Sequence, residues 1–285
     1  LCASIHSHSK VPDLLFPLLH LRRSAAMALG MPEELLPVII PTIVYWIVSG
    51  IYTILWYSSD KHRLFTQEDE DAKNLVTRRR AVAVVLLNQS AQVAIVALSF
   101  WVRKGKGDDD AESRPPPSLV RLAWQLMVGL LFVDTWQYFW HRLIHESEFL
   151  YKHVHYMHHH MVVPYTYGAQ FTHPVDMIVA DTISNTLAAH ITGMSPWTTT
   201  FFFIVHILKS LDDHSGLWFP NSPYSRLLSN NSAWHASHHQ LDGSKHNFSV
   251  LFLNIWDKLL GTYRPCTVER REGGGYQLRA AAKDL

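Results

Sequence analysis

The stretch 35–57, "LLPVIIPTIVYWIVSGIYTILWY", carries no charge and constrains the fold more than any other feature of this chain. A helix needs about 20 apolar residues to cross a bilayer. Pro37 and Pro41 fall in the first turns, where a helix tolerates proline. Trp46 and Trp56 are suited to the membrane interface, where tryptophan is enriched. The stretch therefore predicts a membrane-spanning helix.

Two more stretches of similar length follow closely. Residues 81–102 are uncharged, and residues 119–140 hold only Arg121 near one end and Asp134 near the other. Charged residues make up 17% of the chain, below the roughly 25% of soluble proteins. The alternative is that these stretches are buried helices of a large soluble core. Their length and close succession favour membrane spans.

Residues 175–211 form a fourth apolar segment, interrupted by polar side chains such as Asp181 and His190. We expect a hairpin of two short or partly re-entrant helices, broken at "GMSPW" (193–197). The predicted fold class is all-α: an integral membrane bundle of about 4–5 membrane helices or re-entrant hairpins, with a cytosolic helical cap. Loop 58–80 has six Lys/Arg and loop 103–118 has four, which favours a cytosolic position for loop 58–80.

The domain organisation follows from these segments. We expect residues 1–30 to be a poorly ordered leader that is not native, residues 31–265 to form one membrane-embedded domain, and residues 266–285 to be a cytosolic tail. The formal net charge of +1 gives no overall field that would attract nucleic acid. The two cysteines suit no disulfide framework, so a reducing, cytosol-facing environment fits best.

Histidines are concentrated in the second half of the chain, where 14 of the 19 lie between residues 141 and 239. "HRLIH" (141–145) places two histidines at i and i+4. "HYMHH" (155–159) and "HASHH" (235–239) each place three at i, i+3 and i+4. Residues at these spacings are neighbours on a helix, so we expect each triplet to stack along one side. His153 and His160 fall outside the repeated spacing.

Eight imidazoles exceed the four ligands of a structural zinc site and favour two metal ions. Imidazole binds iron, zinc and copper alike, so the ligand type does not identify the metal. A histidine-rich run is also typical of mobile metal-buffering loops in membrane transporters. Two matching motifs on either side of an apolar hairpin argue instead for a fixed site. His190 and His206 lack ligand spacing and are interpreted as core residues.

The order HxxxH, HxxHH, HxxHH after hydrophobic spans resembles the fatty acid hydroxylase / sterol desaturase superfamily. The segments between these motifs resemble plant-type sphingoid base C4-hydroxylases. The resemblance covers about residues 33 to 265 and is carried by "DEDAKNLVTRRRAV" (69–82), "DTWQYFWHRLIHESEFLYKHVHYMHH" (134–159), "VPYTYGAQFTHPVD" (163–176), "DDHSGLWFP" (212–220) and "NNSAWHASHHQLDGSKHNFSVLFLNIWDKLLGTY" (230–263).

The resemblance implies a histidine-only centre with two iron ions. Its implied ligands, which are also the catalytic residues of such a centre, are His141, His145, His155, His158, His159, His235, His238 and His239, with His173 and His214 as two further metal ligands. Asp134 lies about two helical turns before His141 on the same face, so we predict that its carboxylate orients a ligand imidazole or lies at the interface. Asp212 and Asp213 have the same two interpretations.

The implied activity is O2-dependent hydroxylation at C4 of sphinganine or dihydroceramide, giving phytosphingosine-type bases. It implies electrons from NADH through cytochrome b5 and its reductase, and an endoplasmic reticulum membrane with the histidine site facing the cytosol. Membrane lipids, ceramide synthase or a second copy of the chain are the other expected partners. Sterol C4-methyl oxidases, sterol desaturases and fatty acyl 2-hydroxylases share the histidine motifs, so they stay open as alternatives, as does a histidine-rich metal transporter.

Overall fold

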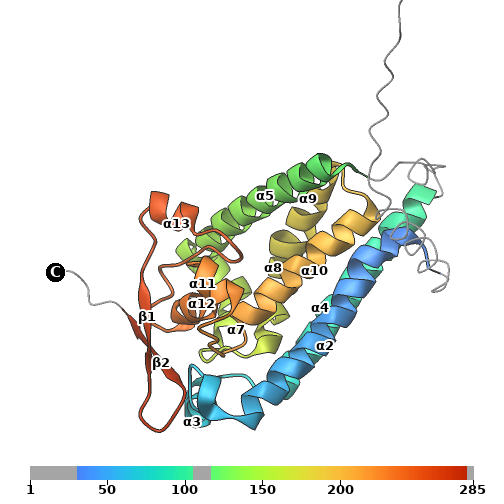
Figure 1. Cartoon of the computed structure of the whole chain (residues 1–285). Helices are drawn as coiled ribbons and strands as arrows, with labels where there is room; N and C mark the ends of the chain where they lie inside the picture. The colour runs from blue at the N-terminus through green and yellow to red at the C-terminus, as the bar shows by residue number, and fades with distance from the viewer. Residues whose placement is uncertain (1–30, 105–116, 281–285) are drawn as a thin grey trace, which may run out of the picture.

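The computed structural model describes residues 31–104 and 117–280. The expected leader, 1–30, and the last residues of the expected tail, 281–285, lie outside the described residues. The described chain is mostly helical, as the sequence predicts, and Figure 1 shows its long helices running side by side as one bundle. The histidine-bearing segments gather toward one end of that bundle.

Three helices are long and apolar enough to cross a membrane, and they occupy the places predicted from the sequence. Their candidate spans are Glu33–Ser58, Arg78–Val102 and Leu119–Glu146. The helices themselves are α2 (Leu36–Ser58), α4 (Arg78–Lys104) and α5 (Leu119–Glu146). Along α2, Ile43, Ile47, Ile51 and Ile54 form an exposed apolar stripe. Such a stripe suits contact with lipid tails.

The apolar segment after residue 174 folds as two helical arms around a break at Gly193. The first arm consists of α8 (Pro174–Asp176), the π-helical η5 (Met177–Ile183) and α9 (Ser184–Thr192), and the second is α10 (Pro196–Asp213). Gly193 ends α9 in the left-handed region with φ of 64°, and Ser195 caps the start of α10. The second arm packs against α2 and the first against α5.

Short elements gather toward the end of the bundle that carries the histidines (Figure 1). They are η2 (Asp60–His62), α3 (Gln67–Lys73), α6 (Glu148–Leu150), the π-helical η3 (Tyr151–His155), α7 (Tyr156–His159), η4 (Thr166–Gln170), α11 (Pro223–Leu227), α12 (Ser232–His239) and α13 (Ile255–Leu259). The short η1 (Glu33–Leu35) precedes α2.

One element was not predicted from the sequence, which suggested helices alone. β1 (Cys266–Arg270) and β2 (Tyr276–Ala280) pair as an antiparallel hairpin across the turn that contains Gly273–Gly275. Val268 is paired with Leu278, and both pack against an apolar cluster around the buried Trp56. The short alternation of apolar and polar residues, with consecutive glycines between, is typical of a hairpin.

One hydrophobic core cluster joins α2, α4, α10 and the segment after α7. Tyr45, Val85, Met161, Tyr165 and Leu211 are among its buried members. Polar side chains tie the same elements together: Trp46 Nε1 donates a 2.7 Å hydrogen bond to Gln89 Oε1. Such bonds between apolar helices fix their relative rotation.

Candidate metal centre

Four parts of the chain bring nine of the ten predicted ligand histidines into one buried region. The end of α5 supplies two, the η3–α7 segment supplies three, the residue after α10 supplies one and α12 supplies three. These nine are His141, His145, His155, His158, His159, His214, His235, His238 and His239. They fall into two groups, called here group A and group B.

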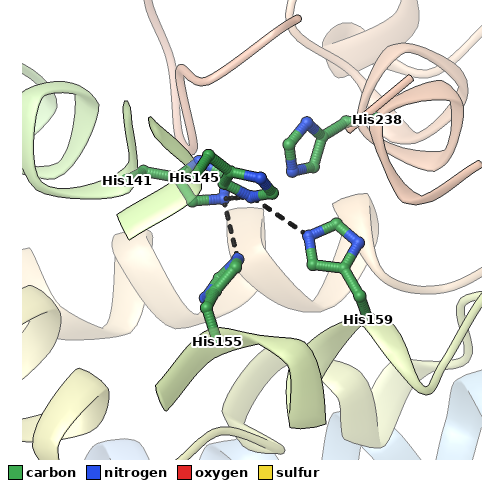
Figure 2. A group of neighbouring side chains, drawn as sticks. All are labelled: His141, His145, His155, His159 and His238. Carbon is green, nitrogen blue, oxygen red and sulfur yellow. Dashed lines mark hydrogen bonds between the residues drawn. The ribbon is translucent and has the colours of Figure 1, made fainter. Parts of the chain in front are cut away.

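Group A consists of five histidines from α5, η3–α7 and α12. Each offers one ring nitrogen, and these nitrogens all lie within 4.8 Å of one another. Figure 2 shows the five rings turned toward a common centre. The Nε2 atom of His141 lies 3.1 Å from that of His155 and 3.2 Å from that of His145. The Nε2 atoms of His145 and His159 are 3.1 Å apart, and His238 completes the group.

Group B consists of His158, His214, His235 and His239, and their ring nitrogens also lie within 4.8 Å of one another. The Nε2 atom of His235 is 3.0 Å from that of His214 and 3.2 Å from that of His239. The two groups adjoin, since the ring centroids of His159 and His239 are 4.9 Å apart. The arrangement therefore offers two neighbouring nitrogen sites.

Each HxxHH motif divides its histidines between the two groups. His155 and His159 enter group A while His158 enters group B, and His235 and His239 enter group B while His238 enters group A. A helix turns by about 100° per residue, so positions i and i+4 nearly coincide in direction while i+3 and i+4 diverge. The expectation that each triplet lines one side was too simple. The adjacent histidines of each motif serve different groups.

Backbone carbonyls fix the proton on five of the nine rings. In each, the Nδ1 atom lies 2.7–3.0 Å from a backbone carbonyl oxygen. The pairs, histidine first, are His141 and Phe248, His158 and Phe171, His214 and Ser210, His238 and His246, and His239 and Met161. A carbonyl oxygen only accepts, so each Nδ1 carries the proton and the Nε2 of the neutral ring presents a lone pair. In metal sites, the hydrogen bond made by one ring nitrogen in this way leaves the other nitrogen free to bind the ion.

Burial keeps these rings neutral. It lowers the pKa of His158 to about 4, with a further contribution from nearby His155, and lowers the pKa of His214 and His238 to about 3. Within group B, the Nε2 lone pairs of His214 and His239 thus both face His235 at 3.0–3.2 Å. Converging lone pairs repel unless a cation lies between them. The Nε2 atom of His238 is likewise buried without a partner in the described chain.

The donor set fits metal ions. All nine ring nitrogens belong to buried or half-buried imidazoles held by their second nitrogens or by packing. Five donors in group A and four in group B match the coordination of two transition-metal ions. Imidazole nitrogen suits iron, zinc and copper.

Asp176 is the carboxylate that contacts a proposed ligand, and the sequence reasoning missed it. Its Oδ2 lies 2.8 Å from His155 Nδ1 and accepts from the Thr172 hydroxyl at 2.7 Å, while its Oδ1 accepts from Trp140 Nε1 at 2.7 Å. A carboxylate–histidine pair of this kind is common behind metal ligands. The signal was present as the acidic residue of "THPVD" (172–176).

The predicted ligand His173 belongs to neither group. It precedes α8, and its Nδ1 accepts a 3.2 Å hydrogen bond from the Val175 amide as the N-cap of that helix. His153 and His160 also lie outside both groups, as their spacing predicts. His153 is exposed, with its Nδ1 2.9 Å from the Phe149 carbonyl.

The three aspartates predicted to orient ligands have other partners. Asp134 accepts from the Phe252 and Leu253 amides at 3.1 and 3.2 Å. Asp212 accepts from the Tyr52 hydroxyl at 2.9 Å, and Asp213 forms a fully buried ion pair with Lys209. Asp134 thus contacts no ligand histidine. It binds the loop that also carries Phe248, whose carbonyl accepts a hydrogen bond from His141.

A cavity opens from both groups into the helical bundle. Its metal-facing wall includes His141 and His155 from group A and His158, His214 and His235 from group B. The rest of its lining includes apolar residues of α2, α4 and α10, among them Pro41, Val96, Phe203 and Ile207. A long alkyl chain fits such a lining, with one end beside the histidines.

Comparison with known proteins gives the family. The sequence model for "Fatty acid hydroxylase" matches residues 126–262. The chain is 45% identical to "Sphinganine C4-monooxygenase 2" of Arabidopsis thaliana, over 89% of this chain and 96% of that protein. It is 39% identical to "Very-long-chain aldehyde decarbonylase GL1-9" of Oryza sativa subsp. indica, over 87% of this chain and 95% of that protein.

A more distant relative is "Sphingolipid C4-hydroxylase sur2" of Schizosaccharomyces pombe, which is 32% identical over 79% of this chain and 86% of that protein. No solved structure matches the chain significantly. The family match spans the α5, η3–α7, α10 and α12 segments that carry all nine grouped histidines. The chain belongs to the fatty acid hydroxylase family.

Proposed function

We propose that this protein is a membrane monooxygenase that hydroxylates C4 of a sphingoid base in sphingolipid biosynthesis. The names of relatives from a plant and a yeast, both C4-specific for sphinganine or sphingolipids, support this reaction. The observation that carries the proposal is the pair of adjoining nitrogen groups in the wall of a cavity with a largely apolar lining. That arrangement brings an alkyl chain to a metal centre.

Two iron ions are the proposed occupants, with groups A and B as their ligands. When bound, they would use O2 to convert a C–H bond to C–OH, with the second oxygen atom leaving as water at the expense of two electrons and two protons. The protein's own task is to hold the imidazoles. The carbonyls of Phe248 and Phe171 fix two of the rings through Nδ1, and Asp176 holds His155.

The cavity walls perform the second task, which is to position the substrate. The apolar lining formed by Val96, Phe203 and Ile207 suits the alkyl tail and keeps water from it. Imidazoles of both groups line the same cavity, so a substrate carbon at that end lies next to both sites. Regioselectivity then depends on how far the head group enters.

Electrons for each turnover must be delivered from outside this domain. We propose NADH as the source, with cytochrome b5 and its reductase as carriers, and the endoplasmic reticulum as the membrane, with the histidine centre facing the cytosol. Ceramide synthase or a second copy of the chain are further proposed partners. Three apolar helices support a multi-pass membrane protein.

Expression in cells that lack phytosphingosine tests the proposal. Long-chain base profiling should show a new trihydroxy base, and metal analysis of the purified protein should show about two irons per chain. An unchanged base profile together with altered sterols, 2-hydroxy acids or alkanes would assign the chain to another activity of the family. Metal flux without O2 consumption would instead indicate a transporter.

A further inference from the structure

Four polar side chains form a layer inside the cavity that the metal chemistry does not use. Gln137 on α5, Asp181 on η5, Asn185 on α9 and His206 on α10 all line the same cavity as the histidine groups. Gln137 lies one helical turn before His141, about 6 Å along the axis. We call these four residues the polar layer. His206 precedes His214 by about two helical turns, so the polar layer adjoins the metal-facing wall.

Two buried acceptors in the polar layer are without a partner in the described chain. Gln137 Nε2 donates to the Ala180 carbonyl and to Asp181 Oδ1, both at 3.3 Å, which leaves Oε1 free. His206 Nδ1 lies 2.8 Å from Asn185 Oδ1, whose amide nitrogen donates to the Asp181 carbonyl. The His206 Nδ1 therefore donates, and its unpartnered Nε2 is an acceptor.

Both of these side chains are deeply buried, with 4% of Gln137 and 6% of His206 exposed. Buried polar atoms are nearly always hydrogen-bonded, and each unpartnered one costs about 1–3 kcal/mol. Both atoms belong to residues that line the cavity, so a ligand bound there can supply their partners. Because both atoms are acceptors, the ligand must bring donors.

Asp181 adds a third acceptor, as comparison with Asp176 shows. Asp176 receives three hydrogen bonds of 2.7–2.8 Å, from His155, Thr172 and Trp140. The Asp181 carboxylate receives only the 3.3 Å contact from Gln137, and no Lys, Arg or His is paired with it in the described chain. The π-helical η5 follows Asp176 and carries Asp181 five residues later, into the same cavity.

We infer that the polar layer binds the head group of a free 2-amino-1,3-diol, with the ammonium at Asp181 and the hydroxyls at His206 Nε2 and Gln137 Oε1. This inference rests on the proposed function. The ammonium and two hydroxyls of sphinganine provide five donors on C1–C3, directly beside C4. A head group held one turn from the imidazoles presents C4 to the metal centre.

The same acceptors disfavour the other substrates considered. N-acylation replaces the ammonium by a neutral amide with a single N–H, and it adds a carbonyl that itself needs a donor. A long-chain aldehyde brings no donor at all. The polar layer thus selects the free base over dihydroceramide, a choice that the histidine motifs leave open.

Direct binding tests this inference with the full-length purified protein as isolated, in detergent and without reductant, so that no turnover occurs. Radiolabelled sphinganine and N-acyl sphinganine are the probes. Asp181→Asn keeps the shape of the side chain and removes its charge, and should weaken sphinganine binding about tenfold or more while changing N-acyl sphinganine less than about twofold. The matched control is the exposed Asp71→Asn, the same chemical change outside the cavity, which should bind both lipids as the wild type does.

A second variant guards against misfolding of the first. His206→Phe keeps a ring of similar size and removes the Nε2 acceptor, and it should also weaken sphinganine binding severalfold, with metal content unchanged. Wild-type affinity for sphinganine in Asp181→Asn, or equal losses for both lipids, would overturn the inference. If the wild-type holoenzyme forms no trihydroxy base from either lipid, the proposed function itself fails, and that outcome is read from a separate assay.

Discussion

His155 Nδ1 lies 2.8 Å from Asp176 Oδ2, and both side chains are almost fully buried. The pair connects η3, which supplies a ligand of group A, to the start of the helical arm that lines the cavity. Thr172 and Trp140 also donate hydrogen bonds to this carboxylate, so its orientation is fixed. The proposed metal ligation and the shape of the cavity therefore involve the same carboxylate.

Asp176→Asn should lower metal occupancy or hydroxylation by about 10- to 100-fold, because outer partners of ligating histidines typically contribute that much. The amide keeps the size of the side chain but loses the charge that supports the His155 N–H. Metal analysis of the purified variant measures the effect. The exposed Asp71→Asn, with the same chemical change outside the centre, should retain wild-type occupancy. Full occupancy in Asp176→Asn would show that the pair does not support a ligand.

His238→Ala should abolish hydroxylation and reduce bound metal, by about 100-fold in activity or more, since a ligand matters at least as much as its outer partner. His238 is the one residue of α12 in group A, and the other four members come from α5 and η3–α7. Trihydroxy base and metal content are the readouts. The exposed His153→Ala is the matched control and should behave as wild type. Unimpaired hydroxylation in His238→Ala would remove group A from the catalytic centre.

Asp134→Ala should destabilise the protein by about 1–3 kcal/mol for each backbone N–H that it leaves unpaired, those of Phe252 and Leu253. The loss should also loosen the loop that carries the Phe248 carbonyl, so metal binding should weaken in parallel. Asp134→Asn retains one acceptor oxygen, so its stability should lie between those of Asp134→Ala and the wild type. Thermal unfolding in detergent with metal analysis checks both effects. A loss of metal without a change in unfolding would contradict the loop mechanism.

Acid should destabilise the protein once metal has been removed by a chelator. Burial lowers the pKa of His158 to about 4 and those of His214 and His238 to about 3, against about 6.5 in an unfolded chain. Below pH 6.5 the unfolded chain therefore binds more protons than the folded one, and stability falls as pH decreases toward 4. The unfolding midpoint should drop between pH 7 and pH 5.

Restoring metal provides the control for this pH effect. An ion bound to the neutral imidazoles stabilises the folded state. The thermal unfolding midpoint should therefore rise, and its decrease with acid should begin at a lower pH. A midpoint of the metal-free protein that stays level from pH 7 to pH 5 would mean that the buried histidines do not control its acid stability.

Local patterns in the sequence were enough to predict the long apolar helices and the nitrogen-rich chemistry. A run as long and apolar as 35–57 has few alternatives to a spanning helix, because its backbone must satisfy its own hydrogen bonds in lipid. The i, i+3, i+4 spacing in "HYMHH" and "HASHH" likewise reflects helix geometry, which is local. Local periodicity is readable from a single sequence, and these features depend on nothing else.

Tertiary structure decided which side chains share a site. His214 joins group B, whereas His173 caps α8, although both stand alone in the sequence. Asp176 contacts His155, whereas Asp134 holds a loop more than a hundred residues away in the chain. The division of each HxxHH motif between the groups depends on how α7 and α12 pack against α5. These choices rest on the relative placement of distant segments, which no local pattern encodes.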